Sequence, residues 1–317
     1  MENNIEYSEA YQNFIDEELE AKSSTQWMVP NDEQIDYSGG KDVKIAQLSV
    51  SGLGNYNSAG TNKYPSGSVK LGWKTYTMEM DRAVKFELGR LDPNDSHFMA
   101  TTENVTREFA RKQLVPEQDM FRFNRIYSKL AASDTYKDTH ILKVGASDAA
   151  TSVVNALKKV SVVVKDDSGD DADFVSFVSL KNEQAFRDES KSTNNSVTFQ
   201  REISVNGVSY RGAVLNDMPC IFVPSKRLQT VIKILDGRTE GQEAGGITAD
   251  STSEQIEFLT MNSSAPVAAS KIDSLKIFSA DENQTGDETT INYHLLYDLW
   301  VLENQIPTLA ACVRNKA

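Results

Sequence analysis

The feature that most constrains the fold is a glycine-rich stretch at positions 49–74, SVSGLGNYNSAGTNKYPSGSVKLGWK. Apolar and polar residues alternate imperfectly before it, over residues 43–48, and more regularly after it, within a second predicted strand at 69–88. Alternation rich in aromatic and β-branched residues is typical of strands, so the sequence predicts a long hairpin with an extended tip. Neither strand has a clean hydrophobic face, and a two-stranded ribbon is not stable alone in water. We therefore expect the hairpin to lie on another surface, as in an assembly.

The glycines of this stretch also resemble part of a phosphate-binding loop. A dinucleotide loop follows the pattern G-x-G-x-x-G, but Asn57 stands at the third glycine position after Gly52 and Gly54. A nucleotide P-loop needs Gly-Lys-Ser or Gly-Lys-Thr, and the chain contains neither. Both loops also need a helix directly afterwards, because its N-terminus supplies the amide donors. Turn and strand formers follow here, so the sequence favours a mechanical hairpin and predicts no cofactor.

Length and composition leave most other classes open. The 317 residues have ordinary apolar and charged fractions, so they suffice for one large domain or two smaller ones. No apolar run reaches about 18 residues, so we expect no transmembrane helix, and the acidic N-terminus lacks the apolar region of a signal peptide. Cys220 and Cys312 are the only cysteines, which favours a reducing compartment. No dense cluster of ligand residues predicts a metal.

Charge is distributed unevenly along the chain. Residues 1–40 carry ten acidic residues and one basic residue, and so hold nine of the thirteen net negative charges. An acidic arm disfavours sequence-independent binding to nucleic acid, which needs lysine and arginine to replace counterions. We interpret residues 1–38 as an N-terminal arm. A solvated, mobile tail is the favoured reading, and the alternative is a segment that orders against a basic surface of a neighbouring subunit.

Residues 96–133 are predicted to be helical. Pro116 is unfavourable within a helix but suits the first turn of a second one. Apolar residues recur at spacings of three and four and predict a single buried stripe: Met120, Phe123, Tyr127 and Leu130. Arg122, Arg125 and Lys129 line another side, which we interpret as a solvated or partner-facing surface rather than a nucleic-acid site.

From residue 138 the pattern becomes α/β, with a strand near 139–144 and a helix over 145–160. The turn between them, GASDA at 145–149, resembles the nucleophile elbow G-x-S-x-G around Ser147, but Ala149 replaces the last glycine. The three histidines stand in no telling context: His97, His140 and His294. Ser147 is equally suited to capping the helix. The acidic segment at 166–173 lacks the spacing of a calcium-binding EF-hand, so we expect a solvated loop there.

Further short elements follow towards the C-terminus. The sequence predicts a strand at 174–180, a short helix at 181–190 and a hairpin that turns at Asn206-Gly207. A buried strand at 218–225 and several later strands complete the pattern. Helices and strands are therefore mixed over the second half of the chain.

Three segments carry a resemblance to a known family. QLVPEQDMFRFNRIYSKLA at 113–131 is similar to the spine helix and its entry in one branch of phage capsid proteins. MPCIFVPSKRL at 218–228 and HLLYDLWVLENQIPTLAACV at 294–313 are similar to strand motifs of that branch, with Gln305 and Ile306 in place of a usual basic residue and its neighbour. Over about residues 40–312, the chain resembles the major capsid proteins of tailed bacteriophages, which have the Hong Kong 97 fold.

The resemblance implies an α+β fold in four parts. Residues 1–38 are the N-terminal arm, and 39–92 are the extended hairpin, or E-loop. Residues 93–140 with parts of 250–317 are the peripheral (P) domain, which holds the spine helix. Residues 141–250 with the remaining parts of 250–317 are the mixed α/β axial (A) domain.

The resemblance also implies a function without catalytic, cofactor or metal residues. Copies would form pentamers and hexamers and close into an icosahedral virion shell around double-stranded DNA, with assembly in the cytoplasm of a bacterial host. Scaffolding and portal proteins are implied partners, and a membrane is not. The implied subunit contacts are Tyr56, Tyr64 and Trp73 on the hairpin, with Arg82, Glu87 and Arg90 on and beyond its second strand. Lys63, Lys70 or Lys74 could form an isopeptide cross-link to a neighbour, but the sequence identifies no acceptor.

Two alternatives differ in what the protein does. An encapsulin-type nanocompartment shell would have the same fold but would enclose cargo enzymes instead of DNA. A serine hydrolase using Ser147 is the more distant alternative. A jelly-roll capsid is disfavoured, because it requires eight strands and little helix.

Overall fold

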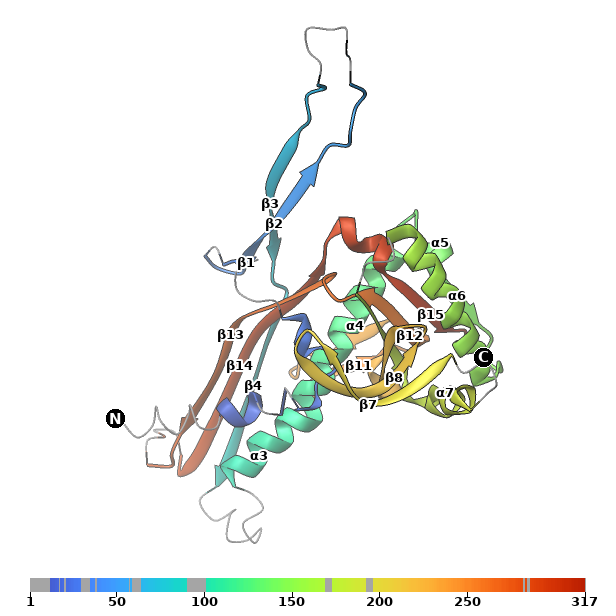
Figure 1. Ribbon diagram of the computed structural model, residues 1–317. Coiled ribbons are helices and arrows are strands. Elements are labelled where there is room, and N and C mark those ends of the chain that lie inside the picture. Colours follow the sequence, from blue (N-terminus) through green and yellow to red (C-terminus); the bar gives the residue numbers. More distant parts are fainter. Residues whose placement is uncertain are drawn as a thin grey trace.

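A computed structural model describes residues 12–16, 18–19, 21–29, 35–37, 39–56, 58, 64–89, 101–168, 173–191, 196–281, 283 and 286–316. These residues form three parts: a projecting hairpin, a sheet layer crossed by one long helix, and an α/β body (Figure 1). Helices and strands are both abundant, so the predicted α+β class is confirmed.

The hairpin consists of β2 (Asp42–Val50) and β3 (Val69–Thr77), which are antiparallel along their whole length. The short strand β1 (Ile35–Asp36) pairs with the base of β2. Beyond this base the hairpin extends away from the rest of the molecule (Figure 1). The strand predicted at 69–88 is in fact two strands. The chain leaves the hairpin after β3, and β4 (Met80–Gly89) joins a different sheet.

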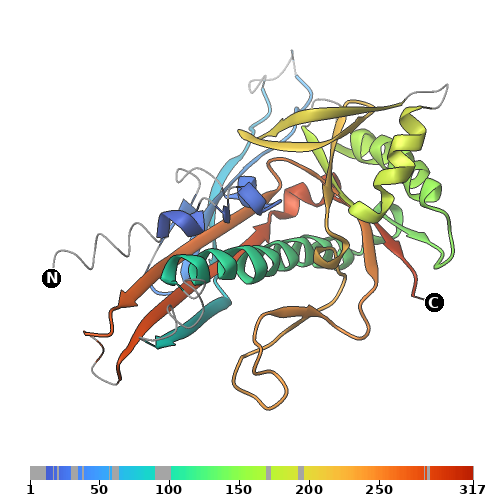
Figure 2. The same ribbon diagram turned by 90° about the horizontal axis from the view of Figure 1, so that it is seen from below.

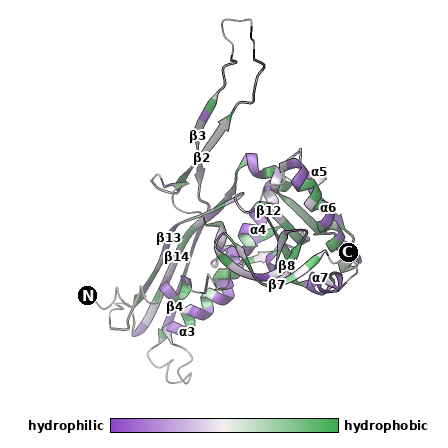
Figure 3. Cartoon of the chain, viewed as in Figure 1, coloured by the Kyte–Doolittle hydropathy of each residue, from purple (hydrophilic) through white to green (hydrophobic). Residues whose placement is uncertain are grey.

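That sheet has three antiparallel strands in the order β13 (Pro266–Phe278), β14 (Glu288–Val301) and β4. A long helix packs along it, with the ring of Phe121 5.4 Å from that of Tyr297 on β14. Figure 3 shows hydrophilic and hydrophobic residues alternating along this helix, as expected for one buried and one solvated side. The sheet layer thus carries the hairpin at one end (Figure 1).

The long helix runs from residue 102 to residue 131 in three segments. These are α3 (Thr102–Phe109), a π-helical turn at Ala110–Leu114 and α4 (Val115–Ala131). Pro116 lies in the first turn of α4, as predicted, but the chain does not break before it. Pro116 has no N–H to donate and its ring would crowd the preceding turn. A wider π turn relieves that crowding.

The body is built on a mixed seven-stranded sheet, in the order β5-β15-β12-β6-β9-β8-β7. Its strands are β5 (Ile141–Val144), β6 (Phe174–Ser179), β7 (Val197–Val205), β8 (Val208–Leu215), β9 (Met218–Val223), β12 (Gln255–Asn262) and β15 (Ala310–Arg314). The pairs β5–β15 and β6–β9 are parallel, and the others are antiparallel.

Two hydrophobic clusters cover the two faces of this sheet. Helices α6 (Ala150–Ser168) and α7 (Glu183–Ser190) pack on one face, where Phe258 of β12 is fully buried. The C-terminal half of the long helix packs on the other face, where the ring of Phe123 lies 5.0 Å from that of Phe177 on β6. The long helix therefore belongs to both the sheet layer and the body, and it joins them.

Several local predictions for the body are confirmed. The β7–β8 hairpin turns at Asn206 and Gly207, both with positive φ (45° and 85°), as a two-residue turn of this kind requires. The predicted helix after GASDA is α6, although it begins five residues later than expected, at Ala150, and extends to Ser168. Residues 169–172 of the predicted acidic loop lie outside the described part of the chain.

The N-terminal segment is not a solvated tail over the residues that the structure describes. We name the described residues between 12 and 29 the strap. Ile15 and Leu19 are buried in the cluster between the long helix and the sheet layer, and Trp27 and Met28 are buried in the body. The favoured interpretation of a mobile arm is wrong for this segment, because these four apolar side chains are buried against the rest of the chain.

Candidate subunit-contact surfaces

The root of the hairpin is anchored firmly to the sheet layer. Val43, Ile45 and Met78 are buried in a small cluster with side chains of β13 and β14. The ring of Tyr76 lies 5.3 Å from that of Trp300. Burial of such side chains contributes roughly 1.5–3 kcal/mol each, so the direction of the hairpin is set by packing within the subunit.

An ion pair adds to this anchor. Lys74 Nζ donates a hydrogen bond to Glu303 Oε1 at 2.7 Å. The bond raises the pKa of Lys74 and lowers the pKa of Glu303. From the sequence, Lys74 was expected only as a possible cross-linking lysine. Glu303 could not be identified as its partner, because the two residues are far apart in the chain.

The outer part of the hairpin exposes large apolar side chains to solvent. Leu53 is fully exposed, Tyr64 is 79% exposed and Trp73 is 53% exposed. Val50, Tyr56 and Val69 are also exposed. The rings of Tyr56 and Tyr64 meet edge to face at 5.1 Å, so the two predicted contact residues lie together. A gathering of exposed apolar side chains on a projecting element is typical of a protein–protein contact surface.

Arg82 lies on β4, away from the hairpin, in a network within the subunit. Its Nε donates to Glu117 Oε1 on the long helix at 2.8 Å. Its Nη1 donates to the Leu235 carbonyl at 2.9 Å, and its Nη2 to the Gly246 carbonyl at 3.3 Å. Both charged side chains are mostly buried. Arg82 therefore joins three elements of its own chain, which the local sequence could not reveal.

The other two predicted contact residues are separate from this network. Glu87 also lies on β4 and forms a half-exposed ion pair with Lys85. Arg90 lies outside the described residues. The structure thus brings Tyr56 and Tyr64 together with Trp73 on one hairpin, but does not place Arg82 or Glu87 there.

A buried polar cluster between the strap and the long helix was missed by sequence reasoning. Asp119 is completely buried. Its Oδ1 accepts hydrogen bonds from the hydroxyls of Ser23 (2.8 Å) and Thr25 (2.6 Å), and its Oδ2 from the amide of Ser24 (3.0 Å) and Nη1 of Arg227 (2.7 Å). The consecutive hydroxyl residues at 23–25 were the one available signal.

Arg122 completes the cluster one turn along the helix. Its Nη1 donates to the carbonyl and the hydroxyl of Thr25 at 3.1 and 3.0 Å. Burial lowers the pKa of Arg122, and the nearby Asp119 carboxylate opposes that effect. The predicted solvated basic side of the helix is therefore wrong for Arg122, which is 3% exposed. Arg227 thus pairs directly with the Asp119 carboxylate, and Arg122 is linked to it through the Thr25 hydroxyl.

A second buried carboxylate, Asp298 of β14, lies where the hairpin leaves the sheet layer. It accepts hydrogen bonds from the amides of Glu79 (3.0 Å) and Leu299 (2.7 Å). Arg125 Nε lies 3.7 Å from its Oδ1. Burial nevertheless raises the pKa of Asp298, because removal from water disfavours the charged form.

The surroundings of Ser147 do not form a hydrolase site in the described part of the chain. Ser147 is exposed, and no hydrogen bond joins it to a described histidine. The ring nitrogens of the buried His140 face the Leu309 carbonyl and the Asp167 carboxylate, each at 2.8 Å. His294 bonds Asp81 on the sheet layer at 2.7 Å. Asp148, rather than Ser147, organises the turn by accepting the amide of Gly145 at 2.7 Å.

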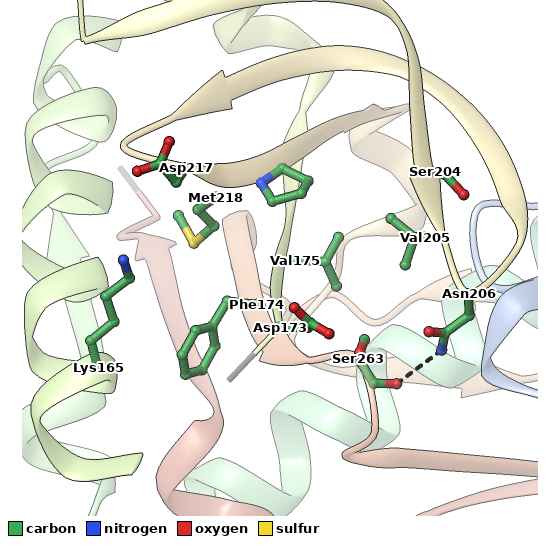
Figure 4. A pocket seen from close by; sticks show the side chains of 11 residues that line it. Lys165, Asp173, Phe174, Val175, Ser204, Val205, Asn206, Asp217, Met218 and Ser263 are labelled. Carbon is green, nitrogen blue, oxygen red and sulfur yellow. Dashed lines mark hydrogen bonds between the residues drawn. The ribbon is translucent and has the colours of Figure 1, made fainter. Parts of the chain in front are cut away.

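The body has a cavity of about 530 Å³ near the turns at Asn206 and Asp217 (Figure 4). Its lining mixes apolar and polar residues, and the charged ones are Lys165, Asp173 and Asp217. Within the described ranges, no group of three His, Cys, Asp or Glu residues is arranged to hold a metal ion. None of the described helices has the length and apolar character needed to cross a membrane.

Known proteins resemble this chain in structure but not detectably in sequence. No protein-family model matches the sequence, and no curated protein sequence is significantly similar to it. The structure, however, is similar to a chain from the capsid of cyanophage P-SCSP1u. The TM-score is 0.61 at 13% identity, over 89% of this chain and 85% of that one.

The protein has a capsid fold. A second match, the mature capsid of bacteriophage PhiM1, has a TM-score of 0.54 at 12% identity, over 88% of this chain and 83% of that one. A virus-like particle from Pyrococcus furiosus matches with a TM-score of 0.51 at 8% identity, over 98% of this chain and 100% of that one. The capsid fold thus includes the hairpin, the sheet layer and the body, and the sequence-based resemblance to phage capsid proteins is confirmed at the level of the fold.

Proposed function

We propose that the chain is the major capsid protein of a tailed bacteriophage. Copies associate into pentamers and hexamers, which close into an icosahedral shell around double-stranded DNA. In the terms of the Hong Kong 97 fold, the hairpin is the E-loop, the sheet layer with the long helix is the P-domain, and the body is the A-domain. The strap is the described part of the N-terminal arm. The mature location is the virion, reached after assembly in the host cytoplasm with scaffolding and portal proteins.

The observation that carries this proposal is the exposed hairpin. Its root is fixed by buried side chains, while Leu53, Tyr64 and Trp73 project where nothing in the described part of the same chain covers them. A monomeric protein gains nothing from a long ribbon with exposed aromatic side chains. A shell subunit does, because the ribbon of one copy covers the surface of the next. The capsid fold over almost the whole chain supports the same reading.

Assembly of this kind is mechanical, and the proposed role is therefore structural rather than enzymatic. Each subunit makes several modest contacts, and closure multiplies them over the shell. Aromatic side chains supply contact area, and charge pairs set the register more than the affinity. The glycine-rich tip lets one sequence fit slightly different neighbours.

Electron microscopy of the purified chain tests the proposal. The chain is produced alone and together with any scaffold gene found beside its own. Closed particles tens of nanometres across are the expected result. A monodisperse monomer under both conditions would contradict a shell function.

A cellular nanocompartment shell is the second candidate. The match to a virus-like particle covers this chain and the other chain nearly completely, which supports this candidate. The contents of particles isolated from the natural source separate the two. Double-stranded DNA supports the phage capsid, and a packaged protein supports the compartment.

A further inference from the structure

A second projecting element lies on the opposite side of the long helix from the strap (Figure 2). It is the loop 235–246, which joins the short paired strands β10 (Ile232–Ile234) and β11 (Ile247–Ala249). Most of its side chains are exposed to solvent. It contributes little to the hydrophobic core, so its sequence is not explained by the fold of the subunit.

Hydrogen bonds inside the loop give it a defined shape. The Asp236 carboxylate accepts the hydroxyl of Thr239 at 2.5 Å and the amides of Thr239 and Arg238, each at 2.9 Å. These bonds lower the pKa of Asp236 to about 2. Glu243 accepts the amide of Gly241 at 2.9 Å. Both carboxylates therefore stabilise the conformation of the loop through hydrogen bonds within it.

The neck of the loop is closed from two sides. Leu235 donates its amide to the Gly246 carbonyl at 3.0 Å. Arg82 donates to the carbonyls of both residues while paired with Glu117. Gly237 and Gly245 face each other across the neck with φ of 69° and 60°, a conformation that other residues rarely adopt. The loop is thus held ready in one shape, which lowers the entropy cost of any contact it makes.

Two charges remain at the exposed end. Arg238 and Glu240 are exposed, and neither has an ion-pair or hydrogen-bond partner for its side chain among the described residues. They have opposite sign and are separated by a single residue. Such a pair is self-complementary, since a second copy turned by a two-fold axis offers the matching charges in reverse order. Exposed Val231 and Ile234 lie at the foot of the same element and add apolar area.

We propose that loop 235–246 is a reciprocal contact between two copies of this chain across a two-fold axis. In it, Arg238 of each copy pairs with Glu240 of the other. The inference rests on the proposed shell function and names a contact distinct from the hairpin. Arg82 acts here as a positioning residue, because it holds the neck and does not reach the partner.

Charge reversal tests the reciprocal pairing. Three variants of the full chain are compared with the wild type under conditions in which the wild type forms particles: R238E, E240R and the double variant R238E/E240R. K181E is the matched control, since Lys181 is an exposed lysine on the body. Sedimentation velocity and electron microscopy measure the assembled fraction, and thermal unfolding confirms that each subunit is folded.

Each single variant places like charges opposite each other, so the assembled fraction falls by about tenfold or more, because repulsion is repeated over the shell. The double variant restores opposite charges and returns the assembled fraction to about that of the wild type. Normal assembly by both single variants overturns the proposed contact. So does a double variant no better than the singles, since that result indicates a different partner surface. A wild type that forms no particles overturns the shell function itself, and this contact with it.

Discussion

The carboxylate of Asp119, on the long helix, accepts a 2.6 Å hydrogen bond from the hydroxyl of Thr25, on the strap. The two residues are far apart in the sequence, and both are completely buried. The strap also places Ile15 against the sheet layer and Trp27 in the body. It therefore spans both parts of the subunit, and Asp119 holds its C-terminal part just before Trp27.

Replacing Asp119 with asparagine is expected to destabilise the subunit by about 3–5 kcal/mol. The amide keeps the shape of the side chain but removes the negative charge that pairs with Arg227 and lies near the buried Arg122. Urea unfolding of the purified chain measures the loss. Asp134→Asn is the control, because Asp134 is almost fully exposed and should leave the unfolding midpoint unchanged. An equal midpoint for both variants would contradict a role for the cluster in stability.

The hairpin tip and its root are expected to respond differently to mutation. The triple variant L53S/Y64S/W73S should unfold at the wild-type midpoint, since these side chains are already exposed, but should fail to assemble. Ile45→Ala, at the buried root, should lose about 2–5 kcal/mol of stability through the cavity it leaves. Thermal unfolding and particle counts by electron microscopy give the two readouts. Normal particles from the triple variant would rule the tip out as a contact surface.

Arg82→Ala is expected to loosen loop 235–246 while the rest of the sheet layer stays protected. Glu117 and the carbonyls of Leu235 and Gly246 would each lose a donor. Hydrogen exchange by mass spectrometry should show faster exchange across the loop. Lys233→Ala, on the neighbouring strand, serves as the control. Arg82→Glu is a poor test of subunit contacts, because it places a second carboxylate beside Glu117 within the same chain.

Asp298 predicts a specific pH dependence. Burial raises its pKa in the folded chain above the unfolded value of about 3.9, so the folded state binds this proton more tightly. The stability that protonation contributes is fully present below the unfolded pKa and is lost as pH rises through the folded pKa. The stability of the wild type relative to Asp298→Asn should therefore fall as pH rises through that window. Urea unfolding of both proteins across the acid range measures it, and a constant difference would disprove the effect.

Local patterns in the sequence predicted the hairpin, the long helix and the turn at Asn206-Gly207, because period, glycine and proline act over a few residues. The same patterns could not show that β4 leaves the hairpin, since pairing with β14 depends on residues about 200 positions later. The strap was misread for the same reason. Its acidic composition indicated a tail, but its few apolar side chains match a surface that only the folded chain creates.

The candidate site was predictable in kind but not in detail. The aromatic residues beside the glycines do lie exposed on the hairpin, and their contact with a neighbouring subunit stays a prediction. Arg82 was predicted to be a contact residue. Its ion-pair partner Glu117 lies on another element, so the residues around Arg82 in the sequence do not indicate it. The loop 235–246 has no hydrophobic pattern, and only its hydrogen bonds distinguish it from an ordinary solvated loop.

The π-helical turn at Ala110–Leu114 changes which side chains of the long helix can share one face. Each residue of an α-helix advances by roughly 100° around the axis, so one extra residue rotates all of α3 by that amount relative to α4. With this rotation Phe109 meets Phe86 and Tyr293 of the sheet layer, while Phe121 meets Tyr297. Deleting one exposed residue, such as Lys112, would turn Phe109 away from the sheet without changing any apolar side chain. In a relative that lacks this turn, the apolar residues of α3 must therefore be shifted by one position in the sequence if they are to face the sheet layer.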